Sequence, residues 1–179
     1  MGATLRIANT WDGKPAPPGE QVEVRLETLP DGDLMIAVRA PFHGDPAPPA
    51  RPGPTDRLWE FEVVELFLAG PAAGPPAERR HPYLEVELGP HGHQLALRFL
   101  GVRNAVERAL AIGCRAEIHG ARWQGEARIP AACLPVRPWS ANAFAMHGHG
   151  AARRHLAATP LPGERPDFHQ PDRFPPLPL

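Results

Sequence analysis

The sequence predicts an all-β fold, an immunoglobulin-like or jelly-roll β-sandwich of about ten antiparallel strands with at most one short helix. Two observations lead to this prediction. Proline and glycine account for 25 and 17 of the 179 residues, which leaves no stretch for a long uninterrupted helix. Short segments of alternating apolar and polar residues also recur between turn signals. The length suits one sizeable core, so we expect a single domain over residues 1–179.

Charge and composition exclude several classes of partner. The chain has 19 Lys and Arg against 20 Asp and Glu, a net charge of −1, so nothing favours nucleic acid or an anionic membrane surface. The first residues lack the apolar stretch of a secretion signal, and no later segment approaches the roughly 18 apolar residues of a membrane span. We therefore expect a cytoplasmic protein. Its two cysteines, Cys114 and Cys133, are expected to be small core residues.

A hairpin is expected between residues 22–27 and 34–38, where aliphatic and polar side chains alternate on both sides of a Pro-Asp-Gly turn. If Leu26 faces Ile36, every aliphatic side chain of both segments lies on one face. The same argument predicts a second hairpin around residue 120. Its expected partners are Ile118 with Trp123 and Arg115 with Glu126.

Residues 58–68 are expected to form a strand in the middle of a sheet. Their apolar side chains occupy both parities, as in a strand covered on both faces. The preceding residues 41–58 hold six prolines and should form a long ordered loop, because proline cannot donate to a sheet ladder. A short helix is expected only at residues 102–112, and further strands at residues 142–149 and 153–158.

Residues 83–88 and 94–99 form another expected hairpin, after a loop rich in Pro, Gly and Ala at residues 69–82. Pairing Leu88 with His93 would gather the aliphatic side chains on one face. The other face would then carry Tyr83, Glu85, Glu87, Gln94 and Arg98. This pairing predicts a polar, organised sheet surface on which a ligand could bind.

Several sequence blocks resemble the DOMON-like fold of family 9 carbohydrate-binding modules. They are LWEFEVVELFL at residues 58–68, YLEVE at 83–87, WQGEARIP at 123–130 and the tail DFHQPDRF at 167–174. A small group of intracellular DOMON-like proteins without an established activity is still more similar. It shares NTWDG at residues 9–13, APF at 40–42 and EVELGPHG at 85–92. The resemblance implies a single DOMON-like β-sandwich domain.

The resemblance also implies a binding site. In family 9 modules a sugar lies between two tryptophans, and a glutamate is among the polar side chains that reach its hydroxyl groups. Trp59 and Glu65 match the first tryptophan and that glutamate in motif and spacing, whereas no second tryptophan falls in a matching motif. An aromatic ring offers apolar surface to a sugar while carboxylates accept its hydroxyl protons. The candidate ligand-binding residues are Trp59, Glu62, Glu65, Tyr83, Glu85, Glu87 and Arg98.

Three functional hypotheses follow. The first is a non-catalytic module for a carbohydrate or similar polyhydroxylated ligand. The second is a metal-dependent or carboxylate-based hydrolase of a small sugar derivative, which requires Glu62, Glu65, Glu85 and a histidine in one cleft. The third is a protein-interaction module, which requires an exposed apolar patch beside the loop at residues 41–58. A purely structural alternative also stays open, with Trp59 a core aromatic and Glu65 a buried structural group.

Calcium and zinc are the candidate metals. The glutamates of the polar sheet face suit calcium, a hard cation, and the resemblance implies structural calcium sites of the kind found in family 9 modules. His147 and His149 form a His-x-His pair that could chelate zinc. His91 and His93 form another such pair, which we expect on an exposed turn.

The C-terminal tail contains Asp167 and His169, which could form a catalytic couple. No nucleophile motif such as Gly-x-Ser-x-Gly accompanies them in the sequence. We therefore expect a structural tail, in which Phe168 and Phe174 pack against the sandwich.

Overall fold

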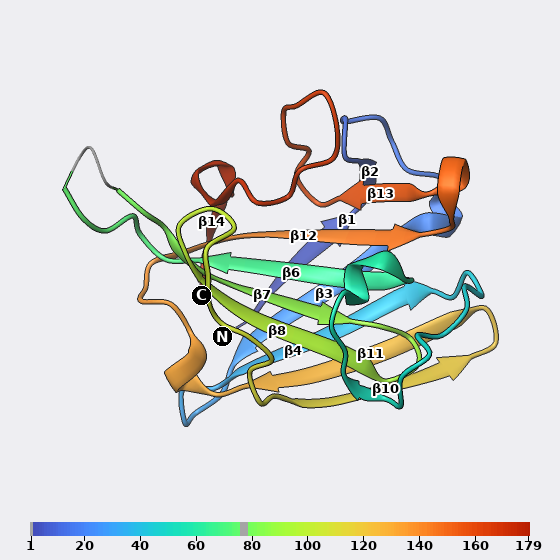
Figure 1. Ribbon diagram of the computed structural model, residues 1–179, viewed down its shortest axis with the longest axis horizontal. Coiled ribbons are helices and arrows are strands. Elements are labelled where there is room, and N and C mark those ends of the chain that lie inside the picture. Colours follow the sequence, from blue (N-terminus) through green and yellow to red (C-terminus); the bar gives the residue numbers. More distant parts are fainter. Residues whose placement is uncertain (1, 76–78) are drawn as a thin grey trace.

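The protein is a sandwich of two β-sheets. The structure, a computed structural model, describes residues 2–75 and 79–179 (Figure 1). Of the loop expected at residues 69–82, residues 76–78 therefore lie outside the described part of the chain. The smaller sheet has the spatial order β1-β3-β4-β11-β10. Its strands are β1 (Gly2–Ile7), β3 (Val22–Thr28), β4 (Leu34–Pro41), β11 (Arg122–Ile129) and β10 (Gly113–His119).

The larger sheet carries the functional candidates. Its spatial order is β2-β13-β12-β6-β7-β8-β5, while β14 pairs with β12 and β9 pairs with β8. All neighbouring strands are antiparallel except β5 and β8. The central strands are β12 (Trp139–His147), β6 (Val63–Ala69), β7 (Pro82–Leu88) and β8 (His93–Leu100). The short outer strands are β2 (Asn9–Thr10), β5 (Gly53–Pro54), β9 (Ala105–Glu107), β13 (Arg154–Ala157) and β14 (Pro176–Leu177).

The prediction of an all-β sandwich is confirmed, but the predicted helix at residues 102–112 is wrong. Arg103 and Ala109 adopt left-handed backbone angles, with φ of 56° and 53°, which interrupt a helix. Between them β9 pairs with β8 instead. The described helical segments are 3-10 turns of three residues: η1 (Pro18–Glu20), η2 (Leu58–Glu60), η4 (Ala131–Cys133), η5 (Gly150–Ala152) and η6 (Pro171–Arg173). In the described part of the chain, none has the length and apolar character that crossing a membrane requires.

Two predicted hairpin registers are confirmed. Leu26 pairs with Ile36 between β3 and β4, and Ile118 pairs with Trp123 between β10 and β11. In each hairpin the hydrophobic pattern and the turn favour the same register, so local sequence is enough to define it.

The predicted register between β7 and β8 is wrong by one residue. Leu88 pairs with Gln94, and the Gly89 amide donates to the His93 carbonyl at 2.9 Å. The turn is therefore one residue shorter than expected, and Gly92 adopts a left-handed conformation with φ of 81°. As a result, Arg98 lies on the opposite sheet face from the glutamates of β7, and leucines take its place beside them.

Apolar side chains form two clusters, one on each face of the larger sheet. The first lies between the sheets and includes Val24, Leu26, Ile36, Val38, Leu66, Leu84, Val86 and Trp123. The second lies on the outer face, where the C-terminal tail adds to it, and includes Phe67, Tyr83, Phe99, Phe144, Phe168 and Phe174. The expected packing of Phe168 and Phe174 is thus confirmed.

Gly125 gives a test of packing between the sheets. A Cβ atom at this position would lie 2.7 Å from ring carbon Cζ3 of the buried Trp123. We expect Gly125→Ala to lower the free energy of unfolding by about 1–3 kcal/mol, because the core has no room for the added methyl group. Urea-induced unfolding measures this loss. In the control Gly113→Ala, on the neighbouring strand, the new Cβ meets nothing within 4 Å, so equal stability of the two variants would contradict the prediction.

Candidate functional site

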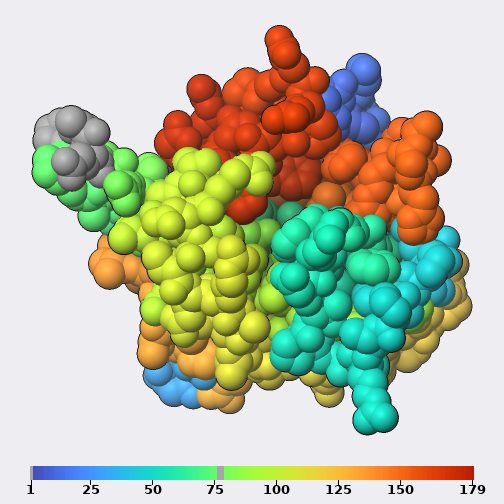
Figure 2. Space-filling model, viewed as in Figure 1, coloured from blue at the N-terminus to red at the C-terminus, as the bar shows by residue number. Residues whose placement is uncertain are grey.

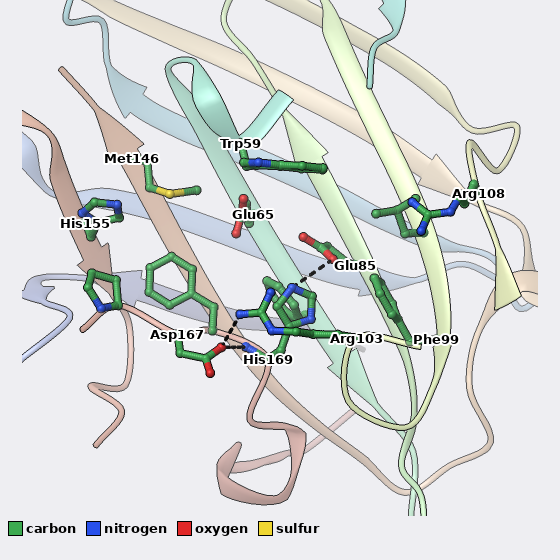
Figure 3. A pocket seen from close by; sticks show the side chains of 14 residues that line it. Trp59, Glu65, Glu85, Phe99, Arg103, Arg108, Met146, His155, Asp167 and His169 are labelled. Atoms are coloured by element: carbon green, nitrogen blue, oxygen red, sulfur yellow. Dashed lines mark hydrogen bonds and ion pairs between the residues drawn. The ribbon is translucent and has the colours of Figure 1, made fainter. Parts of the chain in front are cut away.

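A cavity opens on the outer face of the larger sheet. Its volume of about 350 Å³ lies in the range of roughly 300–1,000 Å³ typical of small-molecule sites. Figure 2 shows the hollow between the teal segment before β6, the yellow-green segment around β8 and β9, and the red C-terminal segment. Figure 3 shows its lining, which includes Trp59, Glu65, Glu85, Phe99, Arg103 and His169.

Three buried glutamates lie together beneath the cavity. Glu65 of β6 stands directly opposite Glu87 of β7, and Glu85 lies two residues earlier on the same face of β7. Their exposed fractions are only 2%, 0% and 4%, respectively. One carboxylate oxygen from each lies within 4.8 Å of the other two. We call Glu65, Glu85 and Glu87 the acid cluster.

Burial makes the acid cluster hard to ionise. It raises the pKa of Glu65 and of Glu87 well above the usual value, and the charges of neighbouring members add to the effect. Burial also raises the pKa of Glu85 to about 7, although the positive charge of Arg103 acts against it. The cluster therefore holds protons at a pH where an exposed glutamate would be fully ionised.

The two guanidinium groups near the acid cluster make their hydrogen bonds elsewhere. Arg103 Nη2 donates to Asp167 Oδ1 at 2.7 Å. Arg153 donates to the main-chain carbonyls of Trp59, Phe61 and Gly148 at 2.6–3.0 Å. Both cations therefore influence the cluster only through space, and the structure shows no bidentate ion pair among the described residues that would neutralise it.

His169 closes one side of the site. Its Nδ1 lies 2.8 Å from the Tyr83 hydroxyl, which also accepts the Arg103 backbone N–H at 3.0 Å. Its Nε2 faces Oε2 of Glu85 at 3.9 Å (Figure 3). Burial, aided by the charge of Arg103, lowers the pKa of His169 to about 4, so the ring is neutral near pH 7. It can therefore donate or accept one hydrogen bond toward the cavity.

Trp59 forms the opposite wall. The strand expected from residue 58 begins only at Val63, because Arg57 takes a left-handed conformation with φ of 58° and the turn η2 follows it. Arg153 stabilises this turn, because its guanidinium donates a hydrogen bond to the Trp59 carbonyl at 2.6 Å. The Trp59 side chain is left 37% exposed and lines the cavity, in contrast to the buried core aromatic of the structural alternative.

Of the seven candidate ligand-binding residues, Trp59, Glu65 and Glu85 line the cavity, whereas Glu62, Tyr83, Glu87 and Arg98 do not. Tyr83 and Glu87 are buried in the sheet behind the lining. Glu62 accepts the backbone N–H groups of His43 and Asp45 at 3.0 and 3.3 Å, so it anchors the preceding loop. Arg98 lies on the other face of the sheet and forms an ion pair with Glu107. The cleft required by the hydrolase hypothesis is therefore incomplete, since Glu62 does not join the other glutamates there.

The histidines of the two pairs make other contacts in the structure. His147 stacks on His43 with ring centroids 3.5 Å apart, while His149 lies 3.8 Å from an Asp45 oxygen. His93, expected on an exposed turn, is buried and contacts a loop carbonyl at 3.0 Å. Within residues 2–75 and 79–179, ligand atoms of three or more Asp, Glu, His or Cys side chains lie within 4.8 Å of one another at the acid cluster.

The exposed apolar surface gives little support to a protein-interaction module. The exposed large apolar side chains of the described chain are Trp59, Leu100, Val102, Val106, Ile118 and Val136. Only Trp59 directly follows the loop at residues 41–58, and its ring lines the cavity. The patch that this hypothesis required beside the loop is therefore not seen in the part of the chain that the structure describes.

Sequence reasoning missed several residues of the cavity. Phe99 would have been placed there by the correct register of β7 and β8, in which it pairs with Tyr83. Asp167 and His169 were assigned to a structural tail, yet they line the cavity and link to Arg103. No distinct signal marked them, since Gln170, Asp172 and Arg173 of the same segment are polar as well.

The fold is a β-sandwich similar to that of carbohydrate-binding modules. The structure is similar to a candidate carbohydrate-binding protein of Bacteroides uniformis, with a TM-score of 0.67 and 18% identity over 97% of this chain and 84% of that one. It is also similar to a family 9 carbohydrate-binding module of Caldicellulosiruptor kristjanssonii, in its complexes with glucose and cellotriose. Those TM-scores are 0.51 and 0.52, with 12% and 13% identity over 80% of this chain and 69% and 67% of that module. Such low identities show the fold alone.

The chain belongs to the UPF0462 family. It is 38% identical to the UPF0462 protein C4orf33 homolog of Mus musculus, over 97% of this chain and 90% of that protein. Identity to the Homo sapiens protein is 37%, over 92% and 82% of the two chains, and to the Danio rerio homolog 36%, over 94% and 85%. No family model matches the sequence. The more specific resemblance to DOMON-like proteins stays a prediction.

The raised pKa of Glu85 predicts how stability depends on pH. The folded protein keeps this carboxyl protonated up to about pH 7, whereas the unfolded chain releases the proton near pH 4.5. The folded state thus binds more protons between these values, and its stability falls as the pH rises through them. Glu85→Gln cannot ionise, so we expect the variant to gain stability over the parent, on the order of 3 kcal/mol, as the pH rises from about 4.5 to 7.

Thermal unfolding of both proteins across this pH range, in buffer with a chelator, measures the difference. The exposed Glu27→Gln on β3 is the control and should track the parent at every pH. If the difference in melting temperature between Glu85→Gln and the parent stays the same across this pH range, Glu85 is ionised normally in the folded state and the prediction is contradicted.

Proposed function

We propose that this protein is a binding module for a saccharide or a similar polyhydroxylated molecule, which it holds in the cavity beside Trp59. One observation carries the proposal: a half-exposed indole ring and the carboxyl groups of Glu65 and Glu85 line the same concave site (Figure 3). A sugar presents an apolar C–H face and a rim of hydroxyl groups, which these two kinds of side chain complement.

The cavity offers hydrogen-bonding groups of different kinds. When ionised, Glu65 and Glu85 accept hydrogen bonds from hydroxyl groups. When protonated, each can also donate one hydrogen bond. Arg103 and Asp167, already paired with each other, add a donor and an acceptor at the rim. Together with His169 they surround a space from which water is partly excluded, where each hydrogen bond to a ligand is stronger than in bulk water.

The structural comparisons support this class of ligand. The family 9 module of similar fold was obtained in complex with glucose and with cellotriose. In the present chain the candidate residues that match that family, Trp59 and Glu65, both line the cavity. We do not propose hydrolysis, because Glu62 lies apart from the residues with which that hypothesis combined it.

Removing the indole ring should weaken sugar binding. We expect Trp59→Ala to lower affinity for glucose or cello-oligosaccharides at least about tenfold, roughly 1.4 kcal/mol, because the stacking surface is lost. Isothermal titration calorimetry of both proteins measures the effect. Ile118→Ala is a matched control, since this side chain is also 37% exposed but lies on β10 in the other sheet.

Two outcomes would contradict the proposal. One is that the parent protein binds no mono- or oligosaccharide or polyol at millimolar concentration. The other is that Trp59→Ala, shown by circular dichroism to be folded, binds the sugar as well as Ile118→Ala does. Either result would leave the similarity to carbohydrate-binding modules as one of fold alone.

A further inference from the structure

Glu87 is the most deeply buried member of the acid cluster, and its carboxylate is unsatisfied. Its exposed fraction is 0%, and neither oxygen makes a hydrogen bond of normal geometry among the described residues, although the backbone N–H of Trp59 lies near enough to favour the charged form. Oε2 of Glu85 is also buried and without a partner there. Buried carboxylates are almost always paired, because their desolvation is very unfavourable. Carboxylate oxygens without partners in so compact a cluster indicate a ligand that binds the glutamates together.

The geometry of the acid cluster suits a cation. One oxygen of each glutamate lies within 4.8 Å of the other two. Calcium binds oxygen at about 2.3–2.6 Å, so ligands on opposite sides of the ion are separated by roughly 5 Å. Three carboxylates can supply up to about six oxygens, which is the lower end of the calcium coordination number. The spacing therefore allows all three side chains to bind one ion from their present positions.

The charge near the cluster also favours a cation. The guanidinium groups of Arg103 and Arg153 bond to Asp167 and to main-chain carbonyls, and the nearest imidazole, His169, faces Glu85 from 3.9 Å. No Lys or Arg of the described chain forms a salt bridge with a cluster carboxylate. A divalent ion would supply the missing positive charge at the point where the three carboxylates converge.

We propose that Glu65, Glu85 and Glu87 form a binding site for one calcium ion beneath the cavity. The donor set consists of carboxylate oxygens, which hard cations prefer, and it lacks the cysteines and multiple histidines typical of zinc. Magnesium is a poorer fit, since it keeps several waters and usually takes only one or two carboxylates.

The ion would also be open to a ligand. Glu65 and Glu85 line the cavity, whereas Glu87 lies behind them, so the free coordination positions of the ion face the cavity. Vicinal hydroxyl groups are oxygen ligands of the kind that calcium accepts. This part of the inference rests on the proposed function, and it predicts that calcium strengthens saccharide binding.

The metal site is tested first without any sugar. Protein dialysed against a chelator is titrated with CaCl₂ and, separately, with MgCl₂ in a calorimeter. We expect one calcium per chain with a Kd below about 1 mM, weaker magnesium binding, and a higher melting temperature with calcium. Glu87→Gln should weaken calcium binding at least about a hundredfold, since it replaces a ligand charge by a neutral amide of the same shape.

A matched control makes the result specific. Glu62→Gln changes another buried glutamate whose oxygens already accept backbone N–H groups, so it should bind calcium like the parent. The proposal is overturned if the chelated parent binds no calcium at millimolar concentration, or if folded Glu87→Gln binds it as well as Glu62→Gln does.

Sugar titrations then separate the two proposals. We expect calcium-loaded protein to bind the saccharide at least about tenfold more tightly than chelated protein, and unchanged affinity would overturn the coupling. Calcium binding without sugar binding in either state would support the metal site and contradict the proposed function. Sugar binding by a protein that takes up no calcium would support the proposed function and contradict the metal site.

Discussion

The outer face of the larger sheet is organised around three carboxyl groups that the fold buries away from water. The cross-strand pairing of Glu65 with Glu87 fixes two of them, and the two-residue period of β7 places Glu85 on the same side. Such a face would be solvated in a simple two-layer sandwich. Here the C-terminal tail covers part of it, with Phe168 stacked on Phe144 at 3.9 Å. The tail thus turns an open sheet surface into a partly enclosed site.

Enclosure has a cost for stability and a benefit for binding. Burial raises the pKa values of the cluster, so the folded protein either retains protons there or needs a positively charged ligand. The same low-dielectric surroundings strengthen each polar contact that a bound molecule makes. Trp59 remains half-exposed at the mouth, so a ligand can reach these groups across an apolar ring. The burial that lowers the stability of the folded protein at the acid cluster would also strengthen the polar contacts of a ligand bound there, as at many functional sites.

The sequence predicted local features well and long-range ones less well. The hairpin of Leu26 and Ile36 was correct because turn and hydrophobic pattern agree in it. The register of β7 and β8 was missed because the alternation favoured gathering all aliphatic side chains on one face. In the structure both faces of this sheet are covered, and Leu95 and Leu97 join the outer cluster instead. Trp59 and Glu65 were found through the resemblance to family 9 modules, although a turn rather than a strand presents the ring. His169 lies far along the chain from the glutamates it faces, so no local pattern could bring them together.

The indole N–H resonances of the tryptophans, followed by nuclear magnetic resonance during a saccharide titration, would decide where the ligand binds. Trp59 lines the cavity, whereas Trp123 and Trp139 belong to the core between the sheets. Binding beside the acid cluster should shift the Trp59 resonance in a saturable way and leave those of Trp123 and Trp139 almost unchanged. A saturable shift confined to the other tryptophans, or none at any sugar concentration, would contradict a saccharide site in this cavity.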